Sequence, residues 1–555
     1  MKIKLIILFI LLSVSQVWAT DFYVDNSCGE NGDGTTTTCG ATGPFDSLAN
    51  ARTGLTGDQS NNRLLFKKGL TFSGPFSVTA YGTSGHNFTI SSYGTGADPI
   101  ISGGAYNVQF DYDGAYIRYV TVDGITFDSA VGREGVWTGA VMIDGNADHI
   151  TIQNCTISNA SNGAEGGTQG INITNSNDNV INNNTIHTND YSGIFVYQAS
   201  GEDSTGTIIS NNTVYGNMYL GIGIDGAYNA HFVDATTLVY GNTCYNNSTG
   251  IYLAFADSIS VYKNTLYDNG ADCQGTGDCL GEKYGFALQS GHNNLIYENK
   301  IYDNSTTGVG IYGDMEDPPS AVERSGPSSG NLFYRNILYG TAAGVWQRGL
   351  NFQTQEDECV GSDNVISNNL IYNNGTNFLS GDSDDTQTCT GNLFYNNSLY
   401  GGTYGIVFQY ATSYAGWTFK NNIFSEGTTY LFDANLVTGG LVTESNLYFE
   451  NGESGNVVRY DGTSYTLTTA CNTFETTGCE NTDPLFTTAG SVFTLQSGSP
   501  CIGDGTDLGN GLLYGLDPTS TWPNNVKPVN QDDYGDWEIG AFIYGPRRGM
   551  AFGGY

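Results

Sequence analysis

The sequence predicts an all-β protein whose fold is a right-handed parallel β-helix, a single solenoid of three-strand coils. A four-residue phrase, in which Asn, any residue, an aliphatic residue and usually Tyr follow one another, recurs at intervals of 22 to 37 residues. A second phrase, Gly followed by apolar residues at alternate positions, starts eight or nine residues after many of these Asn residues, and no helical periodicity lies between the phrases. An internal period of this length is typical of a solenoid.

The Asn phrase occurs in eleven copies, of which the outermost two are worn. Their first residues are Cys155, Asn184, Asn212, Asn242, Asn264, Asn299, Asn336, Asn369, Asn397, Asn421 and Ser445. We expect the Asn residues to stack in one column at a tight turn. Asn tolerates a left-handed backbone, and its amide can hydrogen-bond the Asn of the coils above and below. The column is therefore predicted to be structural.

Each repeat holds three short strand-like stretches. One contains the Asn phrase, one follows the Gly, as in Gly250-Ile-Tyr-Leu253, and one surrounds an apolar residue three positions before the Asn, such as Val261 or Ile296. A unit this short cannot bury its apolar face alone, so the units must stack, with neighbouring coils about 4.8 Å apart.

The ends of the chain predict four segments. Lys2, Lys4, an apolar run and small residues before Ala19 are typical of a secretory signal peptide over residues 1–19. An N-terminal cap with the first coils follows over 20–90, then the solenoid over 91–450, then C-terminal coils and an irregular closing segment over 451–555. We expect a secreted or cell-surface monomer, because no other stretch is apolar and long enough to span a bilayer.

Short sequence motifs near both ends of the chain resemble those of known β-helix proteins. Phe22-Tyr-Val-Asp25 and Gly43-Pro-Phe-Asp-Ser-Leu48 are similar to the N-terminal cap of secreted β-helix proteins of the pectate-lyase-like superfamily, and Asp483-Pro-Leu-Phe486 is similar to a frequent closing segment. The resemblance implies the β-helix fold and an action on polysaccharides. It matches no specific enzyme family, because Gly291-His292 lacks the second Gly of the polygalacturonase motif and Asp317-Pro318 lacks the His of the epimerase motif.

Composition limits the partners. The formal net charge is -36, which disfavours nucleic acid and anionic membranes, and also long anionic polysaccharides unless cations or local basic residues intervene. Eleven cysteines agree with an oxidising compartment. Four pairs that are close in sequence are predicted to form disulfides, with Cys155 and Cys244 in the core and Cys501 left over. These pairs are Cys28 with Cys39, Cys273 with Cys279, Cys359 with Cys389, and Cys471 with Cys479.

The strand after each Gly predicts a substrate groove. If its first and third residues point inward, its second and fourth point outward. Aromatic rings interleaved with polar groups suit a sugar chain, because rings stack on apolar sugar faces and polar groups bind hydroxyls. The predicted substrate-binding residues are Phe195, Tyr197, Asp225, Tyr252, Gln289 and Trp346. The alternative is that these aromatic residues only shield the sheet.

Three neighbouring coils concentrate reactive side chains. His292, Tyr312, Asp314 and Arg348 are the predicted catalytic residues, and stacking is expected to bring His292, Tyr312 and Arg348 within about 10 Å of one another. An Arg that neutralises a uronate, beside a His or Tyr that moves protons, would perform β-elimination, as in polysaccharide lyases. A carboxylate pair would instead hydrolyse a glycosidic bond. The alternative is that these are unrelated surface residues.

Acidic residues and a column of aromatic residues lead to two further predictions. Calcium is a possible cofactor, because Asp25, Glu30 and Asp33, or the three Asp residues between 382 and 385, supply oxygen ligands; plain solvated loops are the alternative. An aromatic column is expected to face out and to stabilise its sheet by stacking. It consists of Tyr215, Tyr245, Tyr267, Tyr302, Tyr339, Tyr372, Tyr400, Phe424 and Tyr448.

The sequence therefore predicts a secreted β-helix protein that binds an extracellular carbohydrate polymer. Cleavage of this polymer, by a lyase or a glycoside hydrolase reaction, is the catalytic form of the prediction. The alternative is a non-catalytic cell-surface or adhesion protein. Long insertions after the Gly-led strands favour the enzyme, whereas the missing active-site motif favours the adhesion protein.

Overall fold

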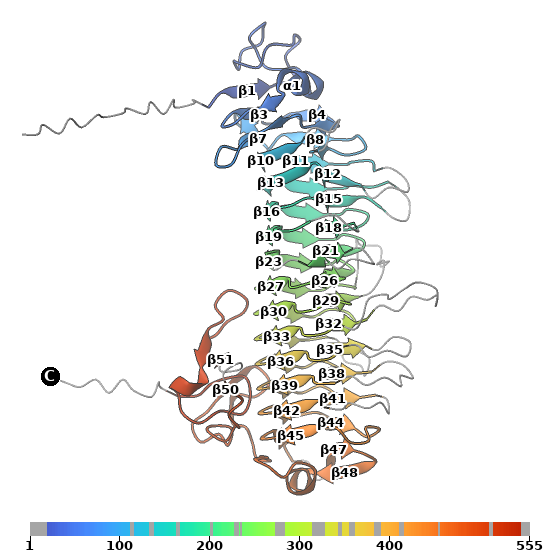
Figure 1. Ribbon diagram of the computed structural model, residues 1–555, viewed down its shortest axis with the longest axis vertical. Helices are drawn as coiled ribbons and strands as arrows, with labels where there is room; N and C mark the ends of the chain where they lie inside the picture. Colours follow the sequence, from blue (N-terminus) through green and yellow to red (C-terminus); the bar gives the residue numbers. More distant parts are fainter. Residues whose placement is uncertain are drawn as a thin grey trace, which may run out of the picture.

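A computed structural model of the chain shows a long stack of short strands (Figure 1). The described residues are 19–110, 116–132, 138–162, 167–199, 204–226, 232–233, 236–271, 283–313, 328–341, 347–353, 361–381, 390–409, 416–452, 455–509 and 514–545. Three sheets of 15, 14 and 15 strands run along the stack, and their strands pair in parallel except for one antiparallel pair at the C-terminal end. The predicted parallel β-helix is confirmed.

The first sheet begins each coil. In spatial order its strands are β1 (Asp21–Val24), β3 (Arg63–Lys67), β7 (Phe88–Tyr93), β10 (Ile117–Asp123), β13 (Ala147–Gln153), β16 (Val180–Asn182), β19 (Ile208–Ser210), β23 (Leu238–Tyr240), β27 (Ser260–Tyr262), β30 (Leu295–Tyr297), β33 (Leu332–Tyr334), β36 (Val365–Ser367), β39 (Leu393–Tyr395), β42 (Thr418–Lys420) and β45 (Val442–Glu444).

The second sheet follows the Asn corner. Its strands are β4 (Thr71–Ser73), β8 (Ile100–Ser102), β11 (Thr126–Asp128), β14 (Thr156–Ser158), β17 (Thr185–His187), β20 (Thr213–Tyr215), β24 (Thr243–Tyr245), β28 (Thr265–Tyr267), β31 (Lys300–Tyr302), β34 (Ile337–Tyr339), β37 (Leu370–Tyr372), β40 (Ser398–Tyr400), β43 (Ile423–Ser425) and β46 (Leu447–Phe449).

The third sheet holds the Gly-led strands. They are β5 (Phe76–Ser77), β9 (Val108–Gln109), β12 (Gly139–Asp144), β15 (Gln169–Thr174), β18 (Ile194–Gln198), β21 (Leu220–Gly226), β25 (Thr249–Ala254), β29 (Tyr284–Gln289), β32 (Thr307–Tyr312), β35 (Arg348–Gln353), β38 (Thr376–Ser380), β41 (Tyr404–Phe408), β44 (Tyr430–Ala434), β47 (Asn456–Tyr460) and β48 (Thr463–Thr466). The Gly residues sit at a crowded corner: a Cβ on Gly193 would lie 2.4 Å from Cγ1 of Val214.

The ends of the stack are irregular. The helix α1 (Leu48–Gly54) lies at the N-terminal end, and the helix α2 (Leu467–Thr469) follows the last coil (Figure 1). The C-terminal segment then folds back along the outside of the coils rather than closing their end. It contains β49 (Phe486–Thr488), β50 (Val492–Leu495), β51 (Tyr514–Leu516) and β52 (Pro528–Asn530). The other short strands are β2 (Gly57–Asp58), β6 (Ala80–Tyr81), β22 (Phe232–Val233) and β26 (Ala256–Asp257).

Buried Asn residues form the predicted column at the corner between the first and second sheets. At each step the backbone N–H and the Nδ2 of one Asn donate to the Oδ1 of the next; between Asn264 and Asn299 both bonds are 3.0 Å. The column runs through Asn184, Asn212, Asn242, Asn264, Asn299, Asn336, Asn369, Asn397, Asn422 and Asn446. We call it the corner ladder.

Three details of the predicted column are wrong. Asn422 and Asn446 are the rungs, not Asn421 and Ser445, because the strand register places the former in the column. The left-handed backbone belongs to the residue before each rung, for example Arg335 with φ 54°, rather than to the Asn. That residue makes the turn and thereby points the amide inward.

Two more Asn ladders occupy the other corners and were not predicted. One passes through Asn189, Asn217, Asn247, Asn269 and Asn304, after the second sheet. The other passes through Asn294, Asn331, Asn364 and Asn392, before the first sheet. Buried amides therefore satisfy the backbone at every corner of the coil.

The corner ladder ends on a carboxylate. Asn446 donates from its backbone N–H to Oε1 of Glu475 at 2.7 Å and from Nδ2 to Oε2 at 2.9 Å, and Tyr448 donates to Oε2 at 3.0 Å. Only 1% of Glu475 is exposed, and this burial raises the pKa of its carboxyl to about 7.

Tyrosine rings stack in two ladders on the outside of the coils. In the second sheet the rings follow His187 from Tyr215 to Tyr372 with parallel planes and centroids 4.8–5.1 Å apart. In the first sheet Tyr240, Tyr262, Tyr297 and Tyr334 form a ladder that was not predicted. Because the ring faces cover one another, only ring edges are left for other contacts.

The predicted stacking is thus confirmed, but three predicted members differ. Phe424 and Tyr448 are fully buried core residues, because the one-residue shift at Asn422 and Asn446 points them inward. The ring of Tyr400 is packed edge-on against Phe486 and Phe493 of the C-terminal segment.

Cysteines divide into bonded and buried ones. Cys28–Cys39 and Cys471–Cys479 are disulfides, as predicted, whereas the pairs Cys273–Cys279 and Cys359–Cys389 lie outside the described residues. The thiols of Cys155, Cys244 and Cys501 are free and buried, and burial raises the pKa of the first and last to about 12. In the described part of the chain, no helix is long and apolar enough to cross a membrane.

Replacing Asn299 by Leu should lower the free energy of unfolding by about 1–3 kcal/mol. The change leaves the amide of Asn264 and the carbonyl of Val261 without Asn299 as their partner in the buried corner, and it removes one of the two hydrogen bonds to Oδ1 of Asn336. Chemical denaturation measures the loss. The same change at the exposed Asn472 should have little effect, and an unchanged midpoint for Asn299→Leu would argue against the ladder's role.

Stability should rise as the pH falls from about 8 to about 5. Glu475 and Glu538 are buried, and burial raises the pKa of each from 4.5 to about 7. The folded chain therefore binds their protons more tightly than the unfolded chain, and the stabilisation is complete below pH 4.5 and lost as the pH rises through about 7. Each of the two carboxyl groups contributes at most about 3 kcal/mol to the change in the free energy of unfolding over this pH range. Glu475→Gln should reduce the pH dependence of the thermal midpoint, and an unaltered slope would contradict this.

Thiol titration of denatured, unreduced protein should find three free cysteines. This count follows if the two disulfides outside the described residues form as predicted beside the two observed ones. Seven thiols would show that only the observed pairs form, and eleven would exclude an oxidising compartment.

Candidate functional site

The register of the third sheet places the predicted groove residues in two outward rows. Phe195 is paired with Gly223, and Gly223 with Tyr252. Tyr197 is paired with Asp225, Asp225 with Ala254, and Ala254 with Gln289. The second row runs along the ends of the strands, and we call Tyr197, Asp225, Gln289 and the ring of Tyr252 beside it the polar row.

One coil is out of the predicted phase. The Gly-led strand there starts at Gly349, so Asn351 rather than Trp346 occupies the second outward position, opposite Gly310. Arg348 pairs with Thr307 at the start of the neighbouring strand, whereas Tyr312 ends that strand. Tyr312 is five residues further along this extended strand than Thr307, so the Cα atoms of Arg348 and Tyr312 are at least about 16 Å apart. The predicted cluster of Arg348 with Tyr312 is therefore wrong, and Trp346 and Asp314 lie outside the described residues.

Exposure divides the remaining predicted residues. Phe195, Tyr312 and Arg348 are only 2%, 5% and 7% exposed, so the prediction that they face solvent is wrong. Tyr197, Asp225, Tyr252, Gln289 and His292 are partly exposed and accessible to a ligand.

The buried rings form a support beneath the polar row. Tyr312 and Tyr284 lie 6.0 Å apart between ring centroids, and with Ala287 they form a small apolar cluster against which Tyr252 packs. Gly310 leaves room for this cluster, because a Cβ there would lie only 3.0 Å from the ring of Tyr284 and would push against it. The Tyr252 hydroxyl donates to Oε1 of Gln289, which fixes the ring and the amide relative to each other.

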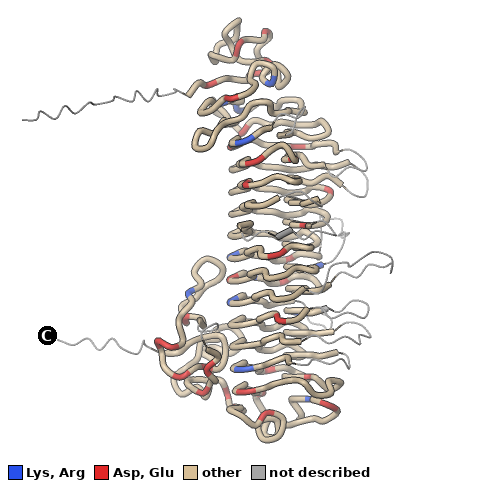
Figure 2. Tube along the Cα trace, viewed as in Figure 1, with Lys and Arg blue, Asp and Glu red and all other residues tan. Residues whose placement is uncertain are grey.

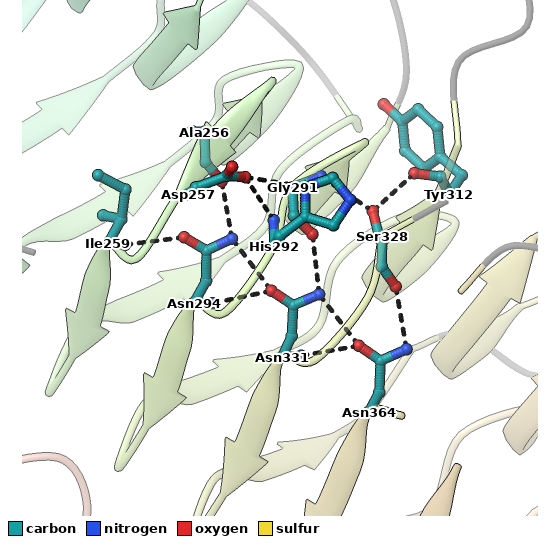
Figure 3. A network of polar contacts seen from close by, with 10 residues as sticks. All are labelled: Ala256, Asp257, Ile259, Gly291, His292, Asn294, Tyr312, Ser328, Asn331 and Asn364. Atoms are coloured by element: carbon teal, nitrogen blue, oxygen red, sulfur yellow. Dashed lines mark hydrogen bonds and ion pairs between the residues drawn. The ribbon is translucent and has the colours of Figure 1, made fainter. Parts of the chain in front are cut away.

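His292 forms a pair with Asp257 beyond the end of β29 (Figure 3). Asp257 Oδ1 lies 2.7 Å from the backbone nitrogen of His292 and 3.1 Å from its Nδ1. Because a carboxylate only accepts, the imidazole donates a ring hydrogen from Nδ1 to Asp257. The side chain of His292 is 28% exposed and that of Asp257 is 15% exposed, so a bound substrate can approach the pair.

The Asn ladder before the first sheet holds this pair in place. Asn294 donates from Nδ2 to the carbonyl of Ala256, next to Asp257, and Asn331 donates to the carbonyl of Gly291, next to His292. Ser328 Oγ accepts from Gly291 and donates to the carbonyl of Tyr312. Figure 3 shows the imidazole above this network. The His–Asp pair therefore sits on rigid backbone.

Asp257 and Tyr284 were missed in the sequence. Asp257 belongs to the short strand β26, outside the repeat phrases. Tyr284 stands one residue before Gly285, a position that reads as part of the preceding loop. A search for acidic residues just after each Gly-led strand would have found Asp257.

Charge around the site is acidic. Figure 2 shows acidic residues along the stack and on the C-terminal segment. The polar row contains Asp225 and no Lys or Arg, and the burial of Tyr197 and the charge of Asp225 raise the pKa of that tyrosine. At the N-terminal cap, Asp25 accepts hydrogen bonds from Lys67 and Ser27, and calcium binding there stays a prediction. The residues 382–385 lie outside the described part of the chain.

Known proteins resemble this chain either over a short stretch of sequence or in structure at low sequence identity. An uncharacterized protein of Bacillus subtilis (strain 168), YwoF, is 34% identical over 90 residues, which are 16% of this chain and 16% of that protein. A mannuronic acid specific polysaccharide family 6 lyase from human gut microbiota has 13% identity and a TM-score of 0.46, over 73% of this chain and 85% of that one. The pectate lyase Pel9A has 13% identity and a TM-score of 0.38, over 95% and 96%.

A family model described as "Right handed beta helix region" matches residues 68–237 and 202–346. Together these ranges cover residues 68–346, half of the 555 residues. They include the first seven copies of the Asn phrase, from Cys155 to Asn336. The chain therefore belongs to the family of proteins with a right-handed β-helix region.

Proposed function

We propose that this protein is secreted and binds an uncharged extracellular polysaccharide along the third sheet, and that His292 transfers a proton in its cleavage. The observation that supports this most is the polar row, which is partly exposed, in register over four coils and next to the Asp257–His292 pair. At about 4.8 Å a coil, the row from Tyr197 to Gln289 is about 14 Å long, enough for more than one sugar unit.

The chemistry of the row suits sugars. The Tyr197 and Tyr252 rings offer apolar surfaces to the C–H faces of pyranose rings, while Asp225 and Gln289 accept hydrogen bonds from hydroxyls. Tyr252 and Gln289 are already joined by a hydrogen bond, so little side-chain freedom is lost on binding.

The charge favours an uncharged chain. With a net charge of -36 and Asp225 and Asp257 at the site, a polyanion would be repelled. Arg348, which was expected to neutralise a uronate, starts its strand at the opposite end from the polar row. The arrangement therefore supports hydrolysis rather than β-elimination.

His292 is the group best placed to move a proton. Asp257 holds its Nδ1 hydrogen, so Nε2 can take a proton from an attacking water, and Asp257 stabilises the imidazolium that forms. This is general base catalysis by an oriented imidazole. The attacking water oxygen bonds to the anomeric carbon while the glycosidic C–O bond breaks. A second water molecule protonates the leaving oxygen, and the hydroxide that remains takes the proton back from Nε2.

A polysaccharide panel with two readouts tests the proposal. Purified protein should bind a neutral polysaccharide and release new reducing ends without unsaturated uronates. Unsaturated uronates would overturn the hydrolytic assignment. Binding without any cleavage would leave the non-catalytic alternative, and no binding to any member would overturn the proposal as a whole.

His292→Ala should reduce the cleavage rate by about 10²–10⁴-fold while binding is retained, because the proton acceptor is lost but the polar row is intact. Asp257→Asn should reduce the rate in the same direction, because the amide no longer orients Nδ1. Tyr252→Ala should instead weaken binding. His86→Ala is the matched control, because His86 is exposed and bonds to Asn61 in the N-terminal cap. Equal loss in the control would indicate a general effect on folding.

A further inference from the structure

The first sheet carries a pocket on a different face from the polar row. It has a volume of about 290 Å³ and is lined by Leu332, Tyr334, Arg335, Val365, Ser367, Asn368 and Tyr514. Its inner residues come from β33, β36 and the turns after them, and Tyr514 comes from β51 of the C-terminal segment, which lies beside these coils (Figure 1).

A break in the first-sheet tyrosine ladder creates the hollow. Tyr334 is its last rung, stacked on Tyr297 at 5.0 Å with the ring planes 4° apart. In the next coil its register partner is Ser367, and in the coil after that it is Tyr395. A hydroxymethyl group therefore stands where the ladder would otherwise place a ring.

Two polar atoms at this break have no hydrogen-bond partner among the described residues. They are Oδ1 of Asn368, a residue that is only 5% exposed, and Nε of Arg335. In the neighbouring coils the same position is satisfied: Oδ1 of Asn396 accepts from Asn421 at 3.3 Å, and Oδ1 of Asn421 accepts from the backbone of Thr506 at 2.8 Å. Buried polar atoms are normally paired, so an unpartnered acceptor and an unpartnered donor on two residues that line the same pocket indicate an external partner.

Arg335 is held rigidly. Its Nη2 lies 3.1 Å from Oε1 of Glu298, its guanidinium carbon lies 4.6 Å from the ring centroid of Tyr334, and its carbonyl accepts from Trp522 at 2.7 Å. Glu298 opposes the charge of the guanidinium, so the pocket offers a fixed N–H donor rather than an unopposed positive charge.

We propose that this pocket binds an uncharged sugar unit, at a site separate from the polar row. A sugar hydroxyl can accept from Nε of Arg335 while it or its neighbour donates to Oδ1 of Asn368, which satisfies both open atoms. Tyr514, which is 52% exposed, presents its ring to the C–H face of the sugar from the outer wall. The site would hold a second part of a glycan, or a side branch, on another face of the solenoid.

Saturation-transfer NMR and calorimetry with short neutral oligosaccharides of glucose, mannose, galactose and xylose test the site. Asn368→Gly removes the open acceptor, and Gly is unstrained at this residue, whose φ is 54°. We expect binding at the pocket to weaken about fivefold to tenfold, as for loss of one hydrogen bond. Tyr514→Ala should weaken it as well.

Asn211→Gly is the matched control, because Asn211 precedes a corner rung with nearly the same φ of 56° but does not line the pocket. It should bind like the parent. Asn368→Gly should weaken binding by the same factor when it is combined with Tyr252→Ala, in which binding at the polar row is already weakened, and this separates the pocket from the polar row.

Three results would overturn the proposal. They are no binding to any oligosaccharide of the panel, unaltered binding by both Asn368→Gly and Tyr514→Ala, and a preference for uronate oligosaccharides over neutral ones. A concentration-dependent dimer that is lost in Tyr514→Ala, without sugar binding, would show that a second copy of the chain fills the pocket instead.

Discussion

A buried amide that donates in one direction along the solenoid is the interaction on which the fold depends. Each corner Asn receives two hydrogen bonds from the preceding coil and passes two bonds on. The corner is buried, so a residue that cannot both donate and accept there would leave several groups unpaired, each at a cost of about 1–3 kcal/mol. The amide column therefore sets the strand register, and the register in turn sets which side chains meet on every outer face.

The sequence was informative wherever one residue alone fits the corner. Asn264, Asn299 and Asn336 are flanked by other residue types, and the structure stacks them as expected. Where two candidates are adjacent, as in Asn421-Asn422, only the pairing with neighbouring coils selects the rung. A similar ambiguity affects the coil of Trp346 and Arg348, because the Gly-led strand there starts at Gly349 and not before Trp346, and the wrong start misplaced Arg348 relative to Tyr312.

The alternation of residues along a strand predicted which way a side chain points better than it predicted how exposed that side chain is. Phe195 and Tyr312 occupy outward positions of their strands, yet they are covered: Phe195 lies against Gly223 of the next coil, and Tyr312 packs with Tyr284. Tyr284 reaches across to Gly310 in this way. Contacts between coils depend on the packing of several side chains at once, which a single strand pattern does not contain. Asp257 was missed for a similar reason: a search after each Gly-led strand would have listed it as a candidate, but its contact with His292 arises only in the stack of coils.

The ladder is polar, and its two ends are not equivalent. At the first rung, Asn184 accepts from the backbone of Cys155 and donates to the carbonyl of Ile152, so no special residue is needed there. At the last rung, Asn446 requires the carboxylate of Glu475. Any internal coil presents the same donors below and the same acceptor above as its neighbours. A whole coil can therefore be duplicated or deleted in the middle of the gene without creating a new end, which gives evolution a simple way to change the length of the protein while Glu475 continues to terminate it.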